Sequence, residues 1–179
     1  SLTTTGTTGA ATVVNATALE LAASTVNGNL VATATTGNLT DSGLVTVTGT
    51  GSFTTSATDA DIDLGTLAST GSVALTTTGT TGAATVVNAT ALELAASTVN
   101  GDLIATATTG NLSDSETVTV TGTSSFVTSA DDAEITVDQL ASTGAVSLTT
   151  GTTGDATVVN ATALDLAAST VNGNLIATA

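Results

Sequence analysis

The 179-residue sequence contains no lysine, arginine, histidine, proline, cysteine, methionine, tryptophan or tyrosine, and its only aromatic residues are Phe53 and Phe126. Fifteen acidic side chains are therefore unopposed, and the formal net charge is −15. A chain without cations cannot neutralise phosphates, which excludes nucleic-acid binding, and an anionic membrane surface repels it. Without cysteine it has neither disulfides nor thiolate metal ligands.

The sequence also lacks a long apolar run. No segment approaches the roughly 20 residues of a transmembrane helix, so we expect no direct membrane insertion. No basic segment precedes an apolar stretch as in a signal peptide, which favours a mature chain or a piece of a longer one. Without His, Cys or Lys, only carboxylates and hydroxyls remain for catalysis, and these recur with the repeat described below, whereas an active site is commonly unique. We expect no enzymatic activity and no cofactor other than, at most, Ca²⁺.

The dominant feature is internal repetition. Residues 2–28 return letter for letter at 75–101, a shift of 73 positions, and a third copy with two substitutions starts at Leu148. Self-similarity at a fixed period is the signature of repeat architectures. We therefore predict one continuous array over 1–179, with units of about 2–74, 75–147 and, truncated, 148–179.

The third copy is one residue short, in a run of threonines. LTTTG at 75–79 becomes LTTG at 148–151. A deletion inside a strand would turn every following side chain to the other face of the sheet. Because the downstream pattern survives, this Thr-Gly segment is predicted to be a turn or a strand end.

Short alternating runs fill each unit, for example 44–48 (LVTVT), 60–64 (ADIDL) and 72–76 (SVALT). Gly, Asn-Gly and Thr-Gly signals bound most of them, and Val and Thr favour strands. Residues 91–96 (ALELAA) are compatible with the start of a helix, but the run is short and its leucines alternate, so we predict a strand. Disorder is the other interpretation of a Thr/Gly/Ser/Ala-rich chain, and the positive mean hydropathy argues against it.

Many short strands within a long period predict a solenoid, in which each coil pairs with the coils before and after it. Dividing 73 by three predicts coils of about 24 residues, drawn for the first unit at about 28–50, 51–70 and 71–100. Strands stacked about 4.8 Å apart would give about seven coils and a rod near 35 Å long. A β-sandwich or barrel is the competing fold, which explains the strands and leaves the period unexplained.

Some segments resemble a known family of repeats. Residues 43–50 (GLVTVTGT), 91–94 (ALEL) and 96–103 (ASTVNGDL) are similar to the "beta strand repeat" sequences of giant bacterial surface proteins, the filamentous-haemagglutinin-like adhesins. The resemblance covers essentially the whole chain. It implies a right-handed parallel β-helix, secretion and display at the cell surface.

The best candidate for a binding site is an acidic segment. Period two places Asp59, Asp61 and Asp63 on one outward face, with Ile62 and Leu64 on the other. The counterparts in the second unit are Asp131, Asp132, Glu134 and Asp138. Clustered carboxylates suit Ca²⁺. The alternative is a solvated acidic edge that keeps rods soluble.

Five Asn-x-Ser/Thr sequons are candidate glycosylation sites. Their asparagines are Asn15, Asn38, Asn88, Asn111 and Asn160. The alternative is a corner asparagine whose amide bonds along the stack.

Thr-x-Thr pairs, such as Thr46/Thr48 and Thr119/Thr121, are compatible with flat hydroxyl ladders of the kind used by ice-binding solenoids. Ordinary strand preference explains them equally well.

Repetition without catalytic side chains predicts an extracellular structural protein, the shaft of an adhesin or a surface fibre. An ice-binding or carbohydrate-binding solenoid is the alternative. The sequence shows no capping segment at Ser1 or Ala179, so we expect end-to-end self-association or continuation of the same chain. Other surface polymers or glycans are further candidate partners.

Overall fold

The computed structural model describes residues 1–179 and contains twenty strands and no helix. All strand pairs are parallel, and they form two sheets that we call sheet 1 and sheet 2. Sheet 1 contains β1 (Ala11–Asn15), β4 (Leu30–Ala34), β7 (Gly51–Thr58), β9 (Val73–Thr78), β11 (Leu92–Leu94), β12 (Ser97–Val99), β14 (Leu112–Asp114), β15 (Val118–Val120), β17 (Ile135–Ser142), β19 (Ala156–Asn160) and β20 (Leu175–Thr178). Sheet 2 contains β2 (Leu19–Leu21), β3 (Ser24–Val26), β5 (Leu39–Asp41), β6 (Val45–Val47), β8 (Ile62–Ser69), β10 (Ala84–Asn88), β13 (Leu103–Ala107), β16 (Ser124–Thr128) and β18 (Val146–Thr149).

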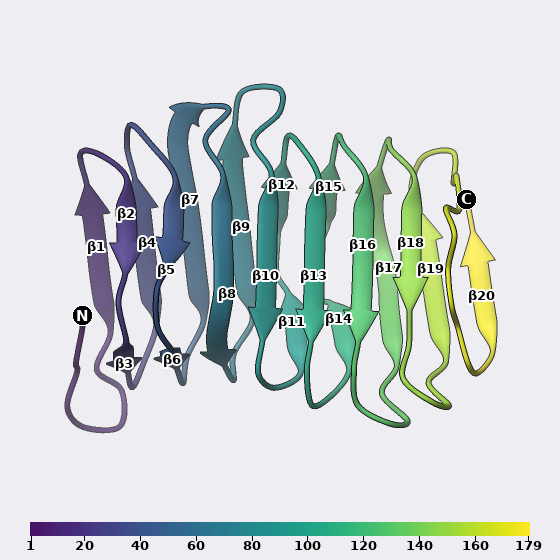
Figure 1. Ribbon diagram of the computed structural model, residues 1–179, viewed down its shortest axis with the longest axis horizontal. Coiled ribbons are helices and arrows are strands. Elements are labelled where there is room, and N and C mark those ends of the chain that lie inside the picture. Colours follow the sequence, from purple (N-terminus) through teal and green to yellow (C-terminus); the bar gives the residue numbers. More distant parts are fainter.

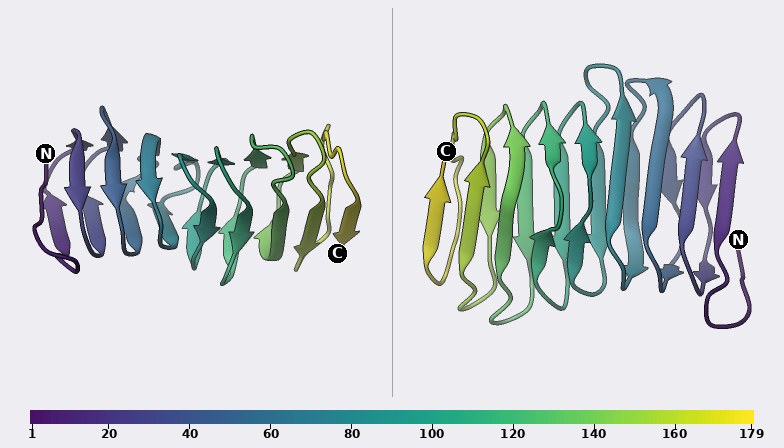
Figure 2. Two further views of the ribbon diagram at one scale, coloured as in Figure 1. Left: turned by 90° about the horizontal axis from the view of Figure 1, so that it is seen from below. Right: turned by 180° about the vertical axis from the view of Figure 1, so that it is seen from behind.

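The chain winds between the two sheets as a flattened β-solenoid of about eight turns. In Figure 1 the nearer strands run downwards and those behind run upwards while the chain advances from left to right, which makes the winding right-handed. Figure 2 shows the same two layers from below and from behind. Eight coils stacked about 4.8 Å apart give a rod of about 40 Å. The predicted solenoid is confirmed, and the predicted handedness agrees with the usual right-handed crossover between parallel strands.

The coils are shorter than the 24 residues expected from the sequence. Residues stacked in neighbouring coils are 19 to 23 positions apart, as in Ala11 with Leu30 and Leu112 with Ile135. The coils drawn at 28–50 and 51–70 lie close to the observed coils that start at Leu30 and Gly51. The third, 71–100, is too long, because the coil that starts at Val73 is already followed by β11. Dividing the period by three assumes three whole coils in each unit of 73 residues.

Each unit instead contains seven successive strand positions, which alternate between the sheets. Because seven is odd, the next unit begins on the opposite sheet. The segment ATVVN shows this directly: it forms β1 in sheet 1, β10 in sheet 2 and β19 in sheet 1 again. One unit is thus three and a half coils long, and successive units are related by a half-turn about the rod axis.

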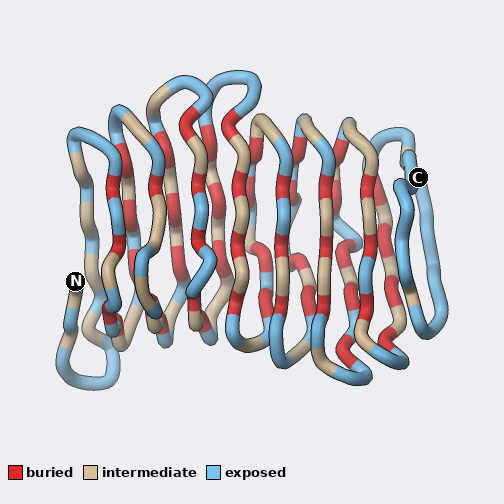
Figure 3. The backbone as a smooth tube through the Cα atoms, viewed as in Figure 1, coloured by how far each residue is buried: buried red, intermediate tan, exposed pale blue.

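Inward-facing side chains form one continuous core between the sheets. Most strands alternate between buried and less buried positions (Figure 3). In β10, Ala84, Val86 and Asn88 are buried, and in β13, Leu103, Ala105 and Ala107 are buried. The cluster of 34 buried hydrophobic residues extends from Leu19 to Val158 and includes both Phe53 and Phe126, which are fully buried. Every coil along this length contributes buried hydrophobic residues to the core.

The two local predictions about the chain path are confirmed. The threonine run is a strand end, because β9 stops at Thr78 and β18 at Thr149, and Gly79 follows with φ of +96°. The leucines of ALELAA form β11 rather than a helix. No helix of the length and apolarity needed to span a bilayer is present.

Candidate functional site

The acidic segment before β8 lies at a corner of the solenoid. Asp59 is one of two non-glycine residues with positive φ, at 59°, and therefore belongs to a turn rather than to the alternating strand expected for it. Its Oδ1 accepts hydrogen bonds from the backbone N–H groups of Thr80 (2.7 Å) and Thr81 (2.9 Å) in the next coil. Asp61 likewise accepts from Ala83 N at 2.9 Å. Both carboxylates therefore cap the following turn.

The second unit repeats this arrangement with different donors. Asp131 accepts from the Thr152 hydroxyl at 2.8 Å, and Asp132, with φ of 58°, is hydrogen-bonded to the Thr153 hydroxyl. The remaining candidate carboxylates are exposed and bind no turn of the next coil. They are Asp63 on β8, Glu134 before β17, and Asp138 on β17.

These carboxylates do not converge on one point. No group of three or more acidic side chains is placed to hold a metal ion. The oxygens of Asp59 and Asp61 instead face backbone donors of the next coil. The structure thus offers no ligand set for Ca²⁺, and Ca²⁺ binding stays a prediction.

Two carboxylates have shifted pKa values, in opposite directions. The Thr80 and Thr81 amides lower the pKa of the exposed Asp59 carboxyl below 3.8, because they stabilise its anion. Burial raises the pKa of Asp114, which lies at the end of β14 and accepts from Asp138 N and Gln139 N. Asp114 therefore caps a corner, and its burial disfavours the charged carboxylate.

The sequon asparagines of the ATVVNAT segment are structural brackets. Asn88 is fully buried; its Oδ1 accepts from Ser69 N (2.7 Å) and its Nδ2 donates to Ser69 O, Thr90 Oγ1 and Ala91 O. Asn160 makes the equivalent bonds around Ser142. The nitrogen that would carry a glycan is buried and engaged in both copies. The folded chain therefore presents neither asparagine as an acceptor.

The other three sequons are more accessible. Asn15 is partly exposed, and its Nδ2 donates only to Thr17 Oγ1 and Ala18 O within its own corner. Asn38 and Asn111 are exposed, and each uses its Oδ1 to accept a backbone N–H of the next coil. Their amide nitrogens make no hydrogen bond within the chain. Glycosylation stays a prediction for these positions.

A second corner bracket recurs in all three copies of the repeat. Thr4, Thr77 and Thr150 each accept an Asn N–H from the next coil through the hydroxyl, and the same Asn Nδ2 donates to the threonine carbonyl. The three partner residues are Asn27, Asn100 and Asn172. No buried polar side-chain atom in the chain lacks a partner.

The threonine pairs noted in the sequence do not share a face. Thr46 lies in β6 of sheet 2 and Thr119 in β15 of sheet 1. The pairing register of sheet 1 instead aligns one threonine from each of five consecutive coils in a ladder on the outward side of that sheet. We call this the sheet 1 threonine ladder: Thr33, Thr54, Thr76, Thr98 and Thr119.

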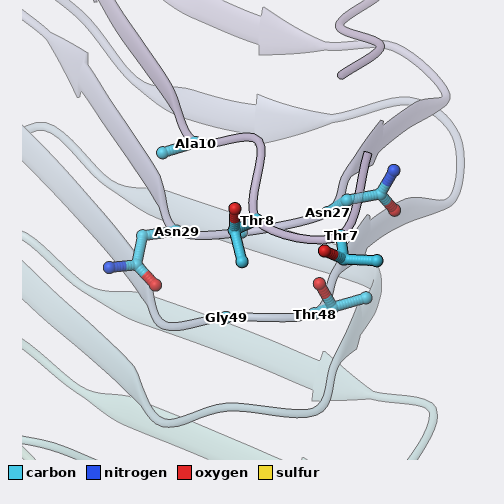
Figure 4. Close-up of a pocket in the computed structure, with 8 residues that line it drawn as sticks. Thr7, Thr8, Ala10, Asn27, Asn29, Thr48 and Gly49 are labelled. Atoms are coloured by element: carbon cyan, nitrogen blue, oxygen red, sulfur yellow. The ribbon is translucent and has the colours of Figure 1, made fainter. Parts of the chain in front are cut away.

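Two shallow surface hollows are present. The polar one, of about 330 Å³, lies where the first corners stack, between Thr7, Asn29 and Thr48 (Figure 4). The apolar one, of about 250 Å³, lies on sheet 2 between Leu44 and Val87. Neither contains a cluster of groups with catalytic chemistry.

Comparison with known proteins identifies the family. A model described as repeats of unknown function (DUF5649) matches residues 8–66 and 81–149. The chain belongs to the DUF5649 repeat family. The two matches start 73 residues apart, which is the period of the internal repeat. No curated protein and no solved structure matches the chain, and the family match itself supports a repeat protein without pointing to haemagglutinin-like proteins in particular.

Proposed function

We propose that this DUF5649 chain is an extracellular structural element, the shaft of an adhesin or of a surface fibre, whose task is to build length. The observation that carries the proposal is the unbroken core. It continues from Leu19 to Val158, and each coil bonds to its neighbours through parallel pairing. Such a stack gains length by adding units that all make the same contacts.

The surface chemistry supports the same role. Fifteen carboxylates and no basic side chain give a rod that repels its neighbours, which opposes lateral aggregation. Several of these carboxylates cap turns of the next coil, so they have a structural use that needs no ligand. The absence of His, Cys and Lys favours a protein without catalytic activity.

The extracellular location rests on the resemblance to beta strand repeat surface proteins. Its test is immunogold labelling of intact source cells with an antibody raised against the purified chain, with permeabilised cells as the control. We expect label on the surface of intact cells, along fibres that project from it. Label seen only after permeabilisation would contradict the proposal.

The sheet 1 threonine ladder favours a second candidate, an ice-binding or carbohydrate-binding surface. Threonines in five consecutive coils stand about 4.8 Å apart on one flat sheet, which provides a regular array of hydroxyl and methyl groups. Thermal hysteresis and a glycan array distinguish this candidate from the shaft. A signal lost in Thr76→Lys and kept in Thr46→Lys, on the opposite sheet, would support a binding face.

A further inference from the structure

One side of the second unit carries no charge. The outward positions of β10, β13, β16 and β18 on sheet 2 are occupied only by Thr, Ser, Val and Ile, and Figure 1 shows these four strands side by side in the nearer sheet. The pairing register places the positions in two rows along the rod, which together we call the neutral face. Row A is Thr85, Ile104, Ser125 and Ser147. Row B is Val87, Thr106, Val127 and Thr149.

Both units divide their charge between the two sheets in the same way. Behind the neutral face, sheet 1 carries the exposed Glu93 on β11 and Asp138 on β17. In the first unit the sheets are exchanged: β1, β4, β7 and β9 of sheet 1 contain no acidic residue, whereas β2 and β8 of sheet 2 carry Glu20 and Asp63. Uncharged and acidic surfaces therefore alternate along each sheet.

The neutral face continues over β8 as the apolar hollow of about 250 Å³. Leu44, which is 53% exposed, and Gly65 both line this hollow. The equivalent positions one unit later are Thr117 and Asp138, so the hollow is apolar where its counterpart on sheet 1 is polar and charged. The uncharged surface of sheet 2 thus extends beyond β10 towards the first unit.

Charge decides which surfaces of two such chains can meet. Each copy carries fifteen carboxylates and no basic side chain, so contact between acidic surfaces places like charges together with no cation between them. Such contacts are unfavourable, whereas two uncharged faces meet without that cost. Ile104 is 44% exposed on the neutral face and gains burial when a second copy covers it.

We propose that the neutral face is a contact surface between two copies of this chain, related by a two-fold axis parallel to the rod. This axis lays row A of each copy on row B of the other. Asp63 continues row A into β8, so in the pair it lies over the Gly65–Thr66 bulge, which continues row B and carries no carboxylate. The inference goes beyond the proposed shaft, which needs only the stack of coils within one chain.

The size of the neutral face sets the strength of the contact. Four strands about 4.8 Å apart, each about five residues long at about 3.3 Å per residue, cover about 300 Å². Pairing buries about twice this area, which is well below the roughly 1,200 Å² of stable complexes. We therefore expect reversible pairing with a dissociation constant of about 0.1–1 mM.

The test follows the full chain as its concentration rises, at neutral pH and about 0.15 M salt, where charge repulsion is screened beyond about 8 Å. Sedimentation equilibrium should show monomers and dimers up to about 1 mM chain. Amide NMR shifts that grow with concentration should lie at Thr85, Ile104 and Val127 on sheet 2. Glu93 and Thr136 on sheet 1 should not shift.

Two variants that borrow a residue from the other unit separate the neutral face from a general effect of charge. Gly65→Asp copies Asp138 and places a carboxylate opposite Asp63 of the other copy, so pairing should weaken at least about tenfold. Thr136→Asp copies Asp63 and adds the same charge to sheet 1, so pairing should change by less than about twofold. Circular dichroism checks that both variants keep the strand content of the original chain.

Three outcomes would overturn the proposal. A chain that stays monomeric at about 1 mM leaves the neutral face to an occupant of another kind. Shifts confined to sheet 1, or to β1 and β20, would show that the copies associate through other surfaces. Equal weakening by Gly65→Asp and Thr136→Asp would mean that net charge, and not the neutral face, controls the association.

Discussion

The asparagine bracket yields a prediction with an internal control. Asn88→Ala removes three donor bonds and one acceptor bond at a fully buried position, leaving Ser69 N without a partner and Ala91 O with only the longer bond from the Thr90 hydroxyl. A buried unpaired polar group costs about 1–3 kcal/mol, and the small cavity adds to this. We expect a loss of about 2–4 kcal/mol in the free energy of unfolding. Asn15→Ala removes only local bonds at a partly exposed site, so we expect less than about 1 kcal/mol.

Urea unfolding followed by circular dichroism measures both losses, and amide hydrogen exchange locates them. Exchange matters because a solenoid is stabilised by neighbour contacts, so one damaged interface can open without global unfolding. In Asn88→Ala we expect faster exchange in β8 and β10. Equal destabilisation by the two variants, or a cost below about 1 kcal/mol for Asn88→Ala, would show that the bracket does not hold the coils together.

Three further predictions concern turns and charge. Gly79→Ala should lower the free energy of unfolding in urea by about 1–3 kcal/mol, because φ is positive there and the new methyl group meets Asp59. Gly65→Asp should change it by no more than about 0.5 kcal/mol, since Asp138 fills the matching position and the nearest atom to the new Cβ is 3.9 Å away. The pKa of Asp59 in the folded chain is lowered from 3.8. The stability that its carboxylate gives to the folded state is therefore complete above the unfolded pKa and is lost as pH falls through the folded pKa. A pH series of thermal melts should show this loss, and the Asp59→Asn variant should lack it. Rods should bundle near pH 4 or with millimolar Ca²⁺ as repulsion falls, and light scattering unchanged under both conditions would contradict this.

The sequence predicts the class of fold well, because the alternation and the period both survive in the structure. It does not reveal how many coils fill a unit. The alternation of side chains along a strand separates inward from outward positions, but it does not show which of two similar sheets the strand joins. Dividing 73 by three was therefore arbitrary. The decisive signal is the number of strand positions per unit, and seven of them become visible only once turns are placed.

The sequence predicts the surroundings of the candidate site residues less well than it predicts the fold. Alternation extended back from Asp61 predicts a strand at Asp59, whereas this residue lies in a turn with positive φ. The alternation of β10 does predict that the sequon asparagine Asn88 is buried, because Ala84 and Val86 point inward and Asn88 follows with the same period of two. Bonds from one coil to the next were out of reach, since they depend on a register that the sequence does not specify.

The half-turn between units limits what the rod can display. A motif that occurs once per unit appears on sheet 1, then sheet 2, then sheet 1, so like motifs on one face are separated by two units. Two units are seven coils, or about 34 Å of rod. A ligand that needs closely spaced copies on one face must therefore use residues from different parts of the unit, as the sheet 1 threonine ladder does across the junction from Thr54 to Thr98. For the core the same half-turn has the opposite effect, because each sheet receives the same inward-facing segment in turn, as ATVVN shows in β1, β10 and β19.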